Sequence, residues 1–362
     1  MNSSARTYFR QPRIEVPLPN LVEVQLQSYA WLFREGLREL FDEISPIDDF
    51  TGKNYRLEFG DYFLEDPKHD ETTARSKNLT YKAPLRARVT LTNKVTGKKK
   101  SSDVFLGDFP LMTSRGSFII NGVERVVVSQ IVRSYGVLFI NDDSVGRKRF
   151  GAKIIPTRGA WLEFETSNRD VISVKIDRKR KIPITTFLRA LGNLSEEQIK
   201  AAFADVDDHP EHHYIESTFN RDPAKTYDDA LVEVYKRIRP GDLVTAESAK
   251  SFIEALLQNY KRYDLGRVGR YKMNQRLGLA RTDETDNRIL RVDDVIEVIK
   301  EIIRLNNDPA AKADDVDSLK NRRVRAVGEL VQGRLRVGLL RMERIVKDRM
   351  SMLDPASIVP SQ

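Results

Sequence analysis

Two clusters of carboxylates are the residues of this sequence best suited to chemistry. Each holds three aspartates within four positions: Asp205, Asp207 and Asp208 in one, and Asp314, Asp315 and Asp317 in the other. Clustered carboxylates can hold the magnesium ions that serve nucleotidyl transfer and phosphodiester hydrolysis. Neither cluster has a strand and turn around it to fix its geometry, so we expect both to lie on solvated loops. The sequence predicts no catalytic residue and no metal ligand.

A histidine-rich segment and a lysine-rich segment are further candidates. The order His209-Pro210-Glu211-His212-His213 differs from the His-Glu-x-x-His motif of helical zinc sites. Lys98-Lys99-Lys100-Ser101 follows Gly97, but Thr92 stands where a phosphate-binding loop has its first glycine. We therefore expect a surface loop and a basic hairpin tip. The sequence has no cysteine, which excludes disulfides, thiolate nucleophiles and cysteine-bound zinc or iron–sulfur sites.

The elements that must position these residues change in character along the chain. Asn20 is placed to cap a helix whose apolar residues recur at helical spacing until Pro46. Two antiparallel hairpins are predicted next, one from residues 85–91 and 104–106 and one around the Asn121-Gly122 turn.

After Gly136 the sequence predicts short strands and then several helices, as expected of a second domain. The strands are expected at residues 154–155, 161–164 and 171–176, and the helices at 195–203, 228–238, 247–258 and 292–305. One long amphipathic helix follows, whose apolar face is Val324, Val327, Val331, Leu335, Leu339, Met342, Val346 and Met350. The predicted fold class is α+β.

Length and charge narrow the class of protein further. A chain of 362 residues exceeds the ~250–300 residues at which one hydrophobic core stops growing, so we expect two domains. The formal net charge of +8 favours polyanionic partners, and residues 321–349 hold nine basic and three acidic side chains. No apolar run reaches the ~18 residues of a membrane span, and residues 1–10 lack the apolar stretch of a signal peptide. We expect a cytoplasmic protein with no membrane partner.

Trp161 is the aromatic residue with the clearest functional interpretation. Strand alternation places it on the same face as Glu163 and opposite Leu162 and Phe164. If the core holds Leu162 and Phe164, Trp161 lies on the wetter face, where an indole could stack on an unpaired base. Packing at a domain interface is the other interpretation, and the pattern does not separate the two.

A long run of residues resembles the β subunit of bacterial RNA polymerase. The run is GDFPLM at 107–112 followed by GSFIINGVERVVVSQ at 116–130. Further similar stretches follow in the same order: IIPTRGAW at 154–161, IDRKRKIP at 176–183, RPG at 239–241, RYDL at 262–265, and residues 321–339, from NRRVR at 321–325 through RVGL at 336–339. The resemblance covers nearly the whole chain and about the N-terminal third of the family's subunit.

The resemblance implies two modules. Residues 1–135 would be the first part of the protrusion, a mixed module with hairpins and long amphipathic helices. Residues 136–320 would be the inserted lobe, with short strands and several helices. Residues 321–362 would be an arginine-rich helix that returns to the protrusion. After Arg133-Ser134 the family typically has proline, whereas Tyr135 stands here.

The implied function is one jaw of the polymerase cleft, which grips DNA and the non-template strand of the transcription bubble. The implied partners are DNA, the β′, α and ω subunits and a σ factor. Catalysis would lie in other regions, because the family's magnesium is held by an Asn-Ala-Asp-Phe-Asp-Gly-Asp motif of β′ that this sequence lacks. We therefore expect no cofactor in this portion.

The resemblance also implies seven DNA-binding residues: Arg133, Trp161, Arg239, Arg262, Asp317, Arg322 and Arg323. Arg133, Trp161 and Asp317 would form a pocket for one unpaired non-template base. A carboxylate such as Asp317 accepts from the N1–H and N2–H edge of guanine, and Arg322 would steady the base or the carboxylate. The other arginines would neutralise phosphates. The alternative interpretation is that Asp317 caps the arginine-rich helix or pairs with Arg322 or Arg323.

Arg125 and Val128 match positions that line the rifamycin pocket of the family. Val128 belongs to an alternating hairpin, however, so it could instead be a core residue. A different function also remains open: a self-contained basic nuclease or nucleotidyltransferase, which would need a divalent metal on an acidic or histidine cluster.

Overall fold

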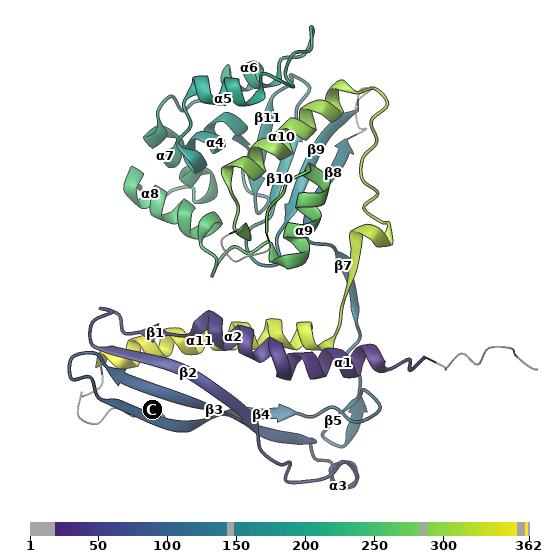
Figure 1. The fold of residues 1–362 in the computed structure, drawn as a ribbon, viewed down its shortest axis with the longest axis vertical. Helices are drawn as coiled ribbons and strands as arrows, with labels where there is room; N and C mark the ends of the chain where they lie inside the picture. Colours follow the sequence, from purple (N-terminus) through teal and green to yellow (C-terminus); the bar gives the residue numbers. More distant parts are fainter. Residues whose placement is uncertain (1–18, 143–147, 283–286, 353–358, 361–362) are drawn as a thin grey trace, which may run out of the picture. The chain divides into compact units, whose positions relative to one another are not determined.

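The computed structural model of the chain describes residues 19–142, 148–282, 287–352 and 359–360 (Figure 1). Residues 1–10, where a signal peptide would begin, lie outside these residues. The chain divides into two compact units. Unit 1 comprises Met1–Gln130 and Val324–Gln362, and unit 2 comprises Ile131–Arg323. Both contain helices and sheets, so the fold is mixed α+β, as predicted.

The helices of unit 1 come from both ends of the chain. Asn20 accepts a hydrogen bond from the Val22 N–H at 3.2 Å, immediately before α1 (Glu23–Trp31). A π-helical turn, Leu32–Gly36, joins α1 to α2 (Leu37–Ile44), which ends before Pro46 as expected. The C-terminal helix α11 (Val327–Met352) packs against α1 and α2.

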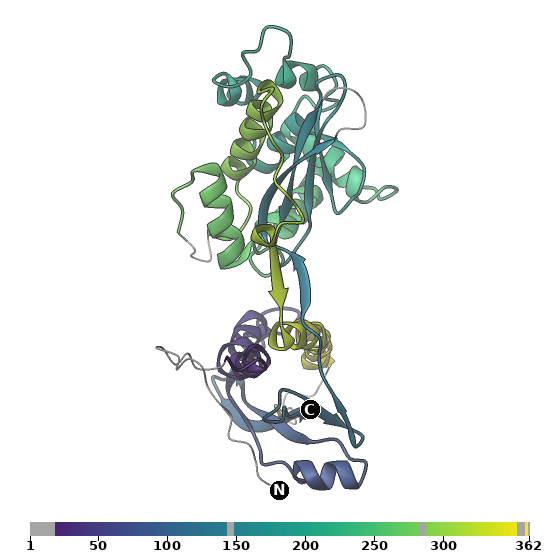
Figure 2. The ribbon, with the colours of Figure 1, turned by 90° about the vertical axis from the view of Figure 1, so that its right-hand side faces the viewer.

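A four-stranded antiparallel sheet forms the other layer of unit 1. Its strands, in spatial order, are β1 (Ile47–Asp48), β2 (Tyr55–Leu64), β3 (Lys82–Asn93) and β4 (Lys99–Pro110). The short helix α3 (Glu71–Ser76) lies between β2 and β3 in the sequence. Every second residue of β3 from Ala83 to Leu91 is buried, because side chains alternate between the faces of a strand. The helices α1, α2 and α11 cover that face, and Figure 2 shows α1 and α11 end-on above the sheet.

The predicted Asn121-Gly122 hairpin is confirmed. It pairs β5 (Phe118–Ile120) with β6 (Val123–Arg125). Asn121 and Gly122 have φ angles of 51° and 78°, the positive values that a type I′ turn requires. A Cβ atom on Gly122 would lie 2.8 Å from Cα of Asn78, so close packing also requires glycine here.

The chain crosses between the units in two strands, β7 (Gln130–Arg133) and β13 (Arg322–Arg325), which pair with each other. This corrects the prediction of a helix from residue 321. Residues 322–325 are extended because their backbone groups pair with β7, and α11 begins only at Val327. Val324 is 53% exposed and does not belong to the apolar face of that helix.

Unit 2 is built on a five-stranded antiparallel sheet. Its strands, in chain order, are β8 (Gly136–Asp142), β9 (Arg149–Ile155), β10 (Leu162–Thr166), β11 (Ile172–Ile176) and β12 (Ile182–Pro183). They also lie in this order in space. The three predicted strands are therefore confirmed. Leu162 and Phe164 are fully buried in a core that extends from this sheet to the helices.

Seven α-helices of unit 2 lie in its described part: α4 (Ile184–Gly192), α5 (Glu196–Phe203), α6 (Tyr214–Phe219), α7 (Tyr227–Ile238), α8 (Ala246–Ile253), α9 (Gly266–Leu277) and α10 (Val292–Asn307). A π-helical turn, Glu254–Gln258, extends α8, and a 3-10 turn, Leu319–Asn321, precedes β13. The four predicted helices are confirmed, and Ser195 caps α5 with a capping box. Helices α4, α6, α9 and α10 contact the sheet. None of the helices described could span a bilayer.

Candidate nucleic-acid interface

Trp161 lies at one end of the unit 2 sheet, just before β10. Its backbone N–H donates to Oδ1 of Asp177 at 2.8 Å, and its backbone carbonyl accepts from the Asp177 N–H at 2.9 Å. Leu162 pairs with Ile154 on one side and with Ile176 on the other, and Ile155 pairs with Gly136. The starts of β8 and β10 and the ends of β9 and β11 therefore meet here, at what we call the Trp161 end of the sheet.

The environment of Trp161 agrees with the predicted alternation. Leu162 and Phe164 are in the core, whereas Trp161 is only half-buried. Glu163, on the same face as Trp161, is buried as well and pairs with Lys153 at 3.3 Å. The indole is thus the accessible apolar group at this end of β10, as stacking on a base would require.

The loop that carries Trp161 is held by an ion-pair network centred on Asp264. The backbones of Arg158 and Asp264 exchange hydrogen bonds of 3.0 and 2.8 Å. The Asp264 carboxylate accepts from Arg288 at 2.9 and 2.6 Å and lies 3.6 Å from the Arg158 guanidinium. A Cβ atom on Gly159, which has a φ of +114°, would lie 2.9 Å from the carbonyl oxygen of Arg262. These contacts place exposed Arg262 beside the Trp161 loop.

Arg133 is the last residue of β7 and lies three residues before β8, the strand that starts at the Trp161 end of the sheet. The Ser134 N–H donates to the carbonyl of Asn321 at 2.8 Å. Gly136, two residues after Ser134, is two strands from Trp161, which corresponds to ~10 Å. The Arg133 side chain is exposed and makes no hydrogen bond or ion pair with another described residue. Tyr135, where the resemblance led us to expect proline, packs under the Arg323 guanidinium at 4.6 Å.

Asp317 lies in the loop that leads to Asn321, and it pairs with Arg322 at 2.5 Å. The Asp317 side chain is 85% exposed, and among the described residues its Oδ2 atom has no hydrogen-bond partner. The backbone around it is fixed by Asp315, whose Oδ1 accepts from the N–H groups of Asp317 and Ser318. The pair with Arg322 fits both interpretations of Asp317. Asp317 cannot cap the arginine-rich helix, because α11 begins ten residues later at Val327.

Arg239 follows α7, and its guanidinium stacks on the Phe252 ring at 4.6 Å. The hydrogen bonds and ion pairs of the described residues do not connect it with the Trp161 end. On α11, Arg336 pairs with Glu43 at 2.9 Å, and Arg325 of β13 pairs with Glu329 at 3.1 Å. Part of the arginine-rich segment is thus engaged within unit 1.

The list of predicted DNA-binding residues omitted a cationic turn at the Trp161 end. Arg178, Lys179 and Arg180 are exposed in the β11–β12 turn, next to the Asp177 that holds the Trp161 backbone. Asp177 and Arg178 have positive φ angles of 48° and 59°. The run IDRKRKIP was the signal in the sequence that could have identified this turn.

The carboxylate and histidine clusters have structural partners. Asp207 accepts from the N–H groups of Tyr214 and Ile215, both at 2.9 Å, at the start of α6. Asp314 accepts from the Phe139 N–H of β8 at 2.8 Å. His212 contacts Asp170 at 2.7 Å. Within the described part of the chain, no three histidine, aspartate or glutamate side chains are grouped to hold a metal ion.

The two rifamycin-pocket candidates lie in unit 1. Arg125 lines a groove of about 980 Å³ together with Val126, Val127 and apolar residues of β4 and α11. Val128 is 76% exposed and lies outside β6, so the interpretation of Val128 as a core residue is wrong. The hairpin is shorter than predicted, because its pairing ends at Arg125.

Comparison with known proteins assigns the family. Residues 136–325, more than half of the chain, match the family described as RNA polymerase Rpb2, domain 2. The chain therefore belongs to the RNA polymerase β-subunit family. The DNA-directed RNA polymerase subunit beta of Chloroflexus aggregans is 49% identical over 98% of this chain and 31% of its own length. The subunits of that name from two strains of Dehalococcoides mccartyi are 48% identical over 98% of this chain and 28% of their own length. The chain spans less than a third of these relatives.

Proposed function

We propose that this chain forms one jaw of the DNA cleft of a bacterial DNA-dependent RNA polymerase. Unit 1 would be the protrusion and unit 2 the lobe. The observation that carries the proposal is the Trp161 end of unit 2. It combines an accessible indole, an exposed carboxylate and exposed arginines around one sheet end, and these groups suit single-stranded DNA.

In this proposal Trp161 stacks on an unpaired base of the non-template strand, and Asp317 reads guanine. The Oδ2 atom of Asp317 is available to accept from the N1–H and N2–H edge, while Arg322 fixes the carboxylate through Oδ1. None of the other three bases offers two adjacent donors at this edge, so a carboxylate cannot bind them through two hydrogen bonds. Arg133, next to the Ser134–Asn321 contact, would hold the adjacent phosphate.

Arg262 and the cationic turn of Arg178, Lys179 and Arg180 would supply further phosphate contacts at this end. Arg323, stacked on Tyr135, and Arg239, stacked on Phe252, would contribute from outside the base pocket. The β′, α and ω subunits and a σ factor are the proposed protein partners. Nucleotidyl transfer and its magnesium ions belong, in this proposal, to β′ and to other parts of β.

Arg125 and Val128 are proposed to border the rifamycin site. The support is that Arg125 lines a large apolar groove of unit 1 and that Val128 presents its side chain to solvent rather than to the core. An exposed Val128 can be enlarged without overpacking the fold.

The test is base-specific binding by the polymerase assembled with this β subunit. Asp317→Ala should weaken binding to bubbles with guanine at the read position by ~1–3 kcal/mol and leave the other three bases almost unchanged. Trp161→Ala should weaken binding by ~1–3 kcal/mol for every base, because stacking does not depend on the hydrogen-bonding edge. Fluorescence anisotropy with four bubbles that differ only at this position gives both results.

Asp293→Ala is a suitable control, because Asp293 is a 74% exposed carboxylate of unit 2 that pairs with Arg281. It should bind all four bubbles as the parent does. An equal loss for the four bases in the Asp317 variant would mean that the carboxylate only holds Arg322, and the base-reading role would be withdrawn.

A further inference from the structure

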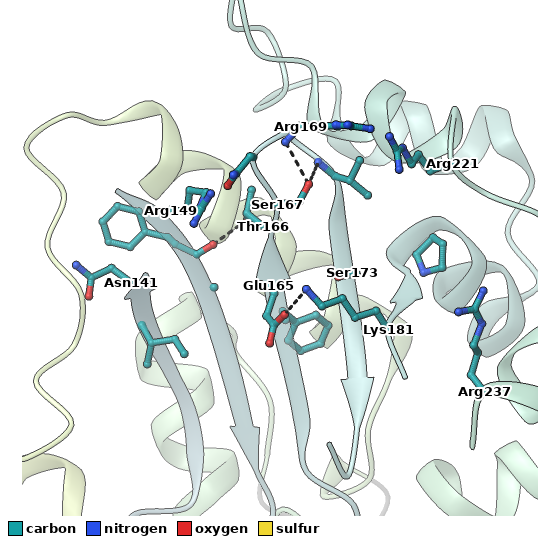
Figure 3. A pocket seen from close by; sticks show the side chains of 17 residues that line it. Asn141, Arg149, Glu165, Thr166, Ser167, Arg169, Ser173, Lys181, Arg221 and Arg237 are labelled. Atoms are coloured by element: carbon teal, nitrogen blue, oxygen red, sulfur yellow. Dashed lines mark hydrogen bonds and ion pairs between the residues drawn. The ribbon is translucent and has the colours of Figure 1, made fainter. Parts of the chain in front are cut away.

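A basic pocket of about 840 Å³ lies over the unit 2 sheet, toward the end opposite Trp161 (Figure 3). It is lined by residues from all five strands, by Arg221 in the turn after α6 and by Arg237 near the end of α7. Five cations face it, Arg149, Arg169, Lys181, Arg221 and Arg237, and Glu165 is the only carboxylate among the described residues of its lining. None of the DNA-binding residues proposed above lines this pocket.

Two of the five cations have no neutralising partner among the described residues. Lys181 pairs with Glu165 at 2.9 Å, and Arg237 pairs with Glu233 at 2.6 Å. The guanidinium groups of Arg169 and Arg221 are exposed and form no ion pair with any residue that the structure describes. Figure 3 shows both along the same rim of the pocket. Two unpaired like charges on one rim disfavour each other until an anion lies between them.

The turns that carry these two arginines are well anchored. Ser167 Oγ accepts from the N–H groups of Arg169 and Val171 at 3.3 and 3.1 Å, which fixes the β10–β11 turn. The Ile172 N–H donates to Oγ1 of Thr218 at 3.0 Å, and the Arg221 N–H donates to the carbonyl of Thr218 at 3.0 Å. Thr218 thus joins the two turns. Their backbones are positioned before a ligand arrives, which lowers the entropic cost of binding.

We propose that this pocket binds a small polyphosphate ligand, through its phosphates rather than through a base. Arginine pairs with phosphate oxygens by two parallel hydrogen bonds, and a chain of phosphates brings several negative charges into one pocket. The part of the lining that the structure describes has five cations and one carboxylate, Glu165. This excess of positive charge suits a ligand with several phosphates better than a ligand with one carboxylate. The volume is within the ~300–1,000 Å³ typical of small-ligand sites.

The described lining offers no stacking surface for a nucleobase. Its aromatic residues are Phe150 and Phe164, which are 2% and 0% exposed. A single-stranded nucleic acid would therefore lack the aromatic contacts that it finds at Trp161. A duplex backbone is convex and would touch the rim rather than fill the cavity. A compact polyphosphate can contact Arg169, Arg221 and Lys181 together.

The experiment is calorimetric titration of the 362-residue chain with inorganic tripolyphosphate at constant ionic strength. We expect saturable binding at one site per chain, which an equal charge concentration of sulfate does not reproduce. Arg169→Ala with Arg221→Ala should weaken it at least about tenfold, since each removes a charge-assisted hydrogen bond. Replacing both by lysine should restore part of the affinity, because the charge returns without the bidentate geometry.

Arg178→Ala with Arg180→Ala is the matched control. It removes the same charge from exposed positions at the Trp161 end, and it should leave tripolyphosphate binding unchanged. For single-stranded DNA the reverse is expected: the Arg178 and Arg180 variant should weaken binding, and the Arg169 and Arg221 variant should not. The polyphosphate site and the proposed DNA interface are therefore tested separately.

Three results would overturn the proposal. One is the absence of saturable tripolyphosphate binding up to millimolar concentration. A second is equal weakening by both double variants, which would mean general charge attraction. The third is tighter binding of polyglutamate or duplex DNA than of tripolyphosphate, with this binding lost in the Arg169 and Arg221 variant. Polyglutamate would indicate an acidic protein segment as the occupant, and duplex DNA a second nucleic-acid contact.

Discussion

A large stability effect is expected at Asp264, because it holds together the loops that carry Trp161 and Arg262. Its carboxylate is only 7% exposed and lies between the guanidinium groups of Arg288 and Arg158, which are 19% and 17% exposed. It also accepts from the Gly266 N–H at 2.7 Å. Asp264→Ala removes the carboxylate that both of these largely buried guanidinium groups contact.

The expected magnitude follows from this burial. Removing one partner of a buried ion pair costs ~3–5 kcal/mol, because the remaining charge stays desolvated. The arginines are partly hydrated, so we expect about 3 kcal/mol for Asp264→Ala. An exposed pair contributes only ~0.2–1 kcal/mol. Asp293→Ala is the control and should cost less than ~1 kcal/mol, because the Asp293 carboxylate is 74% exposed and Arg281 keeps Asp294 as a counter-charge at 3.6 Å.

The assay is urea unfolding followed by tryptophan fluorescence. The chain has two tryptophans, so a Trp31→Phe background leaves Trp161 as the reporter of unit 2. The Asp264 variant should shift the Trp161 transition to lower urea without changing its slope, which marks a change in stability alone. A shift that corresponds to less than ~1 kcal/mol, or no greater than that of Asp293→Ala, would refute the reasoning.

Three other expectations follow from local geometry. Gly328→Ala should destabilise unit 1 by ~1–3 kcal/mol, because its Cβ would lie 2.0 Å from the Ser28 carbonyl oxygen. The control is Gly338→Ala in the same helix: its Cβ meets no atom within 4 Å, and alanine favours a helix more than glycine does, so the melting temperature should rise slightly. Burial opposes ionisation of Asp49, but hydrogen bonds from Thr51, Tyr55 and Asn54 outweigh it and lower its pKa to about 2. Its contribution of about 2 kcal/mol is therefore present above pH ~4 and lost as the pH falls toward 2, and Asp49→Asn should remove this part of the acid dependence in thermal melts. Val128→Phe should leave the melting temperature unchanged and confer rifamycin resistance on the assembled polymerase, whereas loss of folding would contradict the exposed position of Val128.

Sequence periodicity predicted the helices and strands whose buried residues recur at regular helical or strand spacing. The residues at helical spacing from Val331 to Met350 pack in or against the unit 1 core, and the alternation in β3 and the Asn121-Gly122 turn are as expected. Val324 was assigned to the helix because it continued that spacing. The spacing cannot reveal that residues 322–325 pair with β7, a strand from a distant part of the sequence.

Elements that depend on long-range contacts were not foreseen. Helix α9 has few apolar residues, and its Arg270 is fully buried only because Asp294 of α10 binds it at 2.8 and 3.0 Å. The network of Arg158, Asp264 and Arg288 likewise depends on which loops meet. The pair of Asp317 and Arg322 could be proposed because both residues lie in one short segment.

The central claim, that the Trp161 end of unit 2 binds DNA, is tested most directly by the salt dependence of binding to a single-stranded fork. Arg133 and Arg262 are exposed and form no ion pair with other described residues, so Arg133→Ala with Arg262→Ala removes charge without breaking the fold. The slope of log affinity against log salt should fall by ~0.7 for each single-stranded phosphate that the variant no longer neutralises. Arg169→Ala with Arg221→Ala should leave slope and affinity unchanged. Equal slopes for the parent and both double variants would contradict the claim.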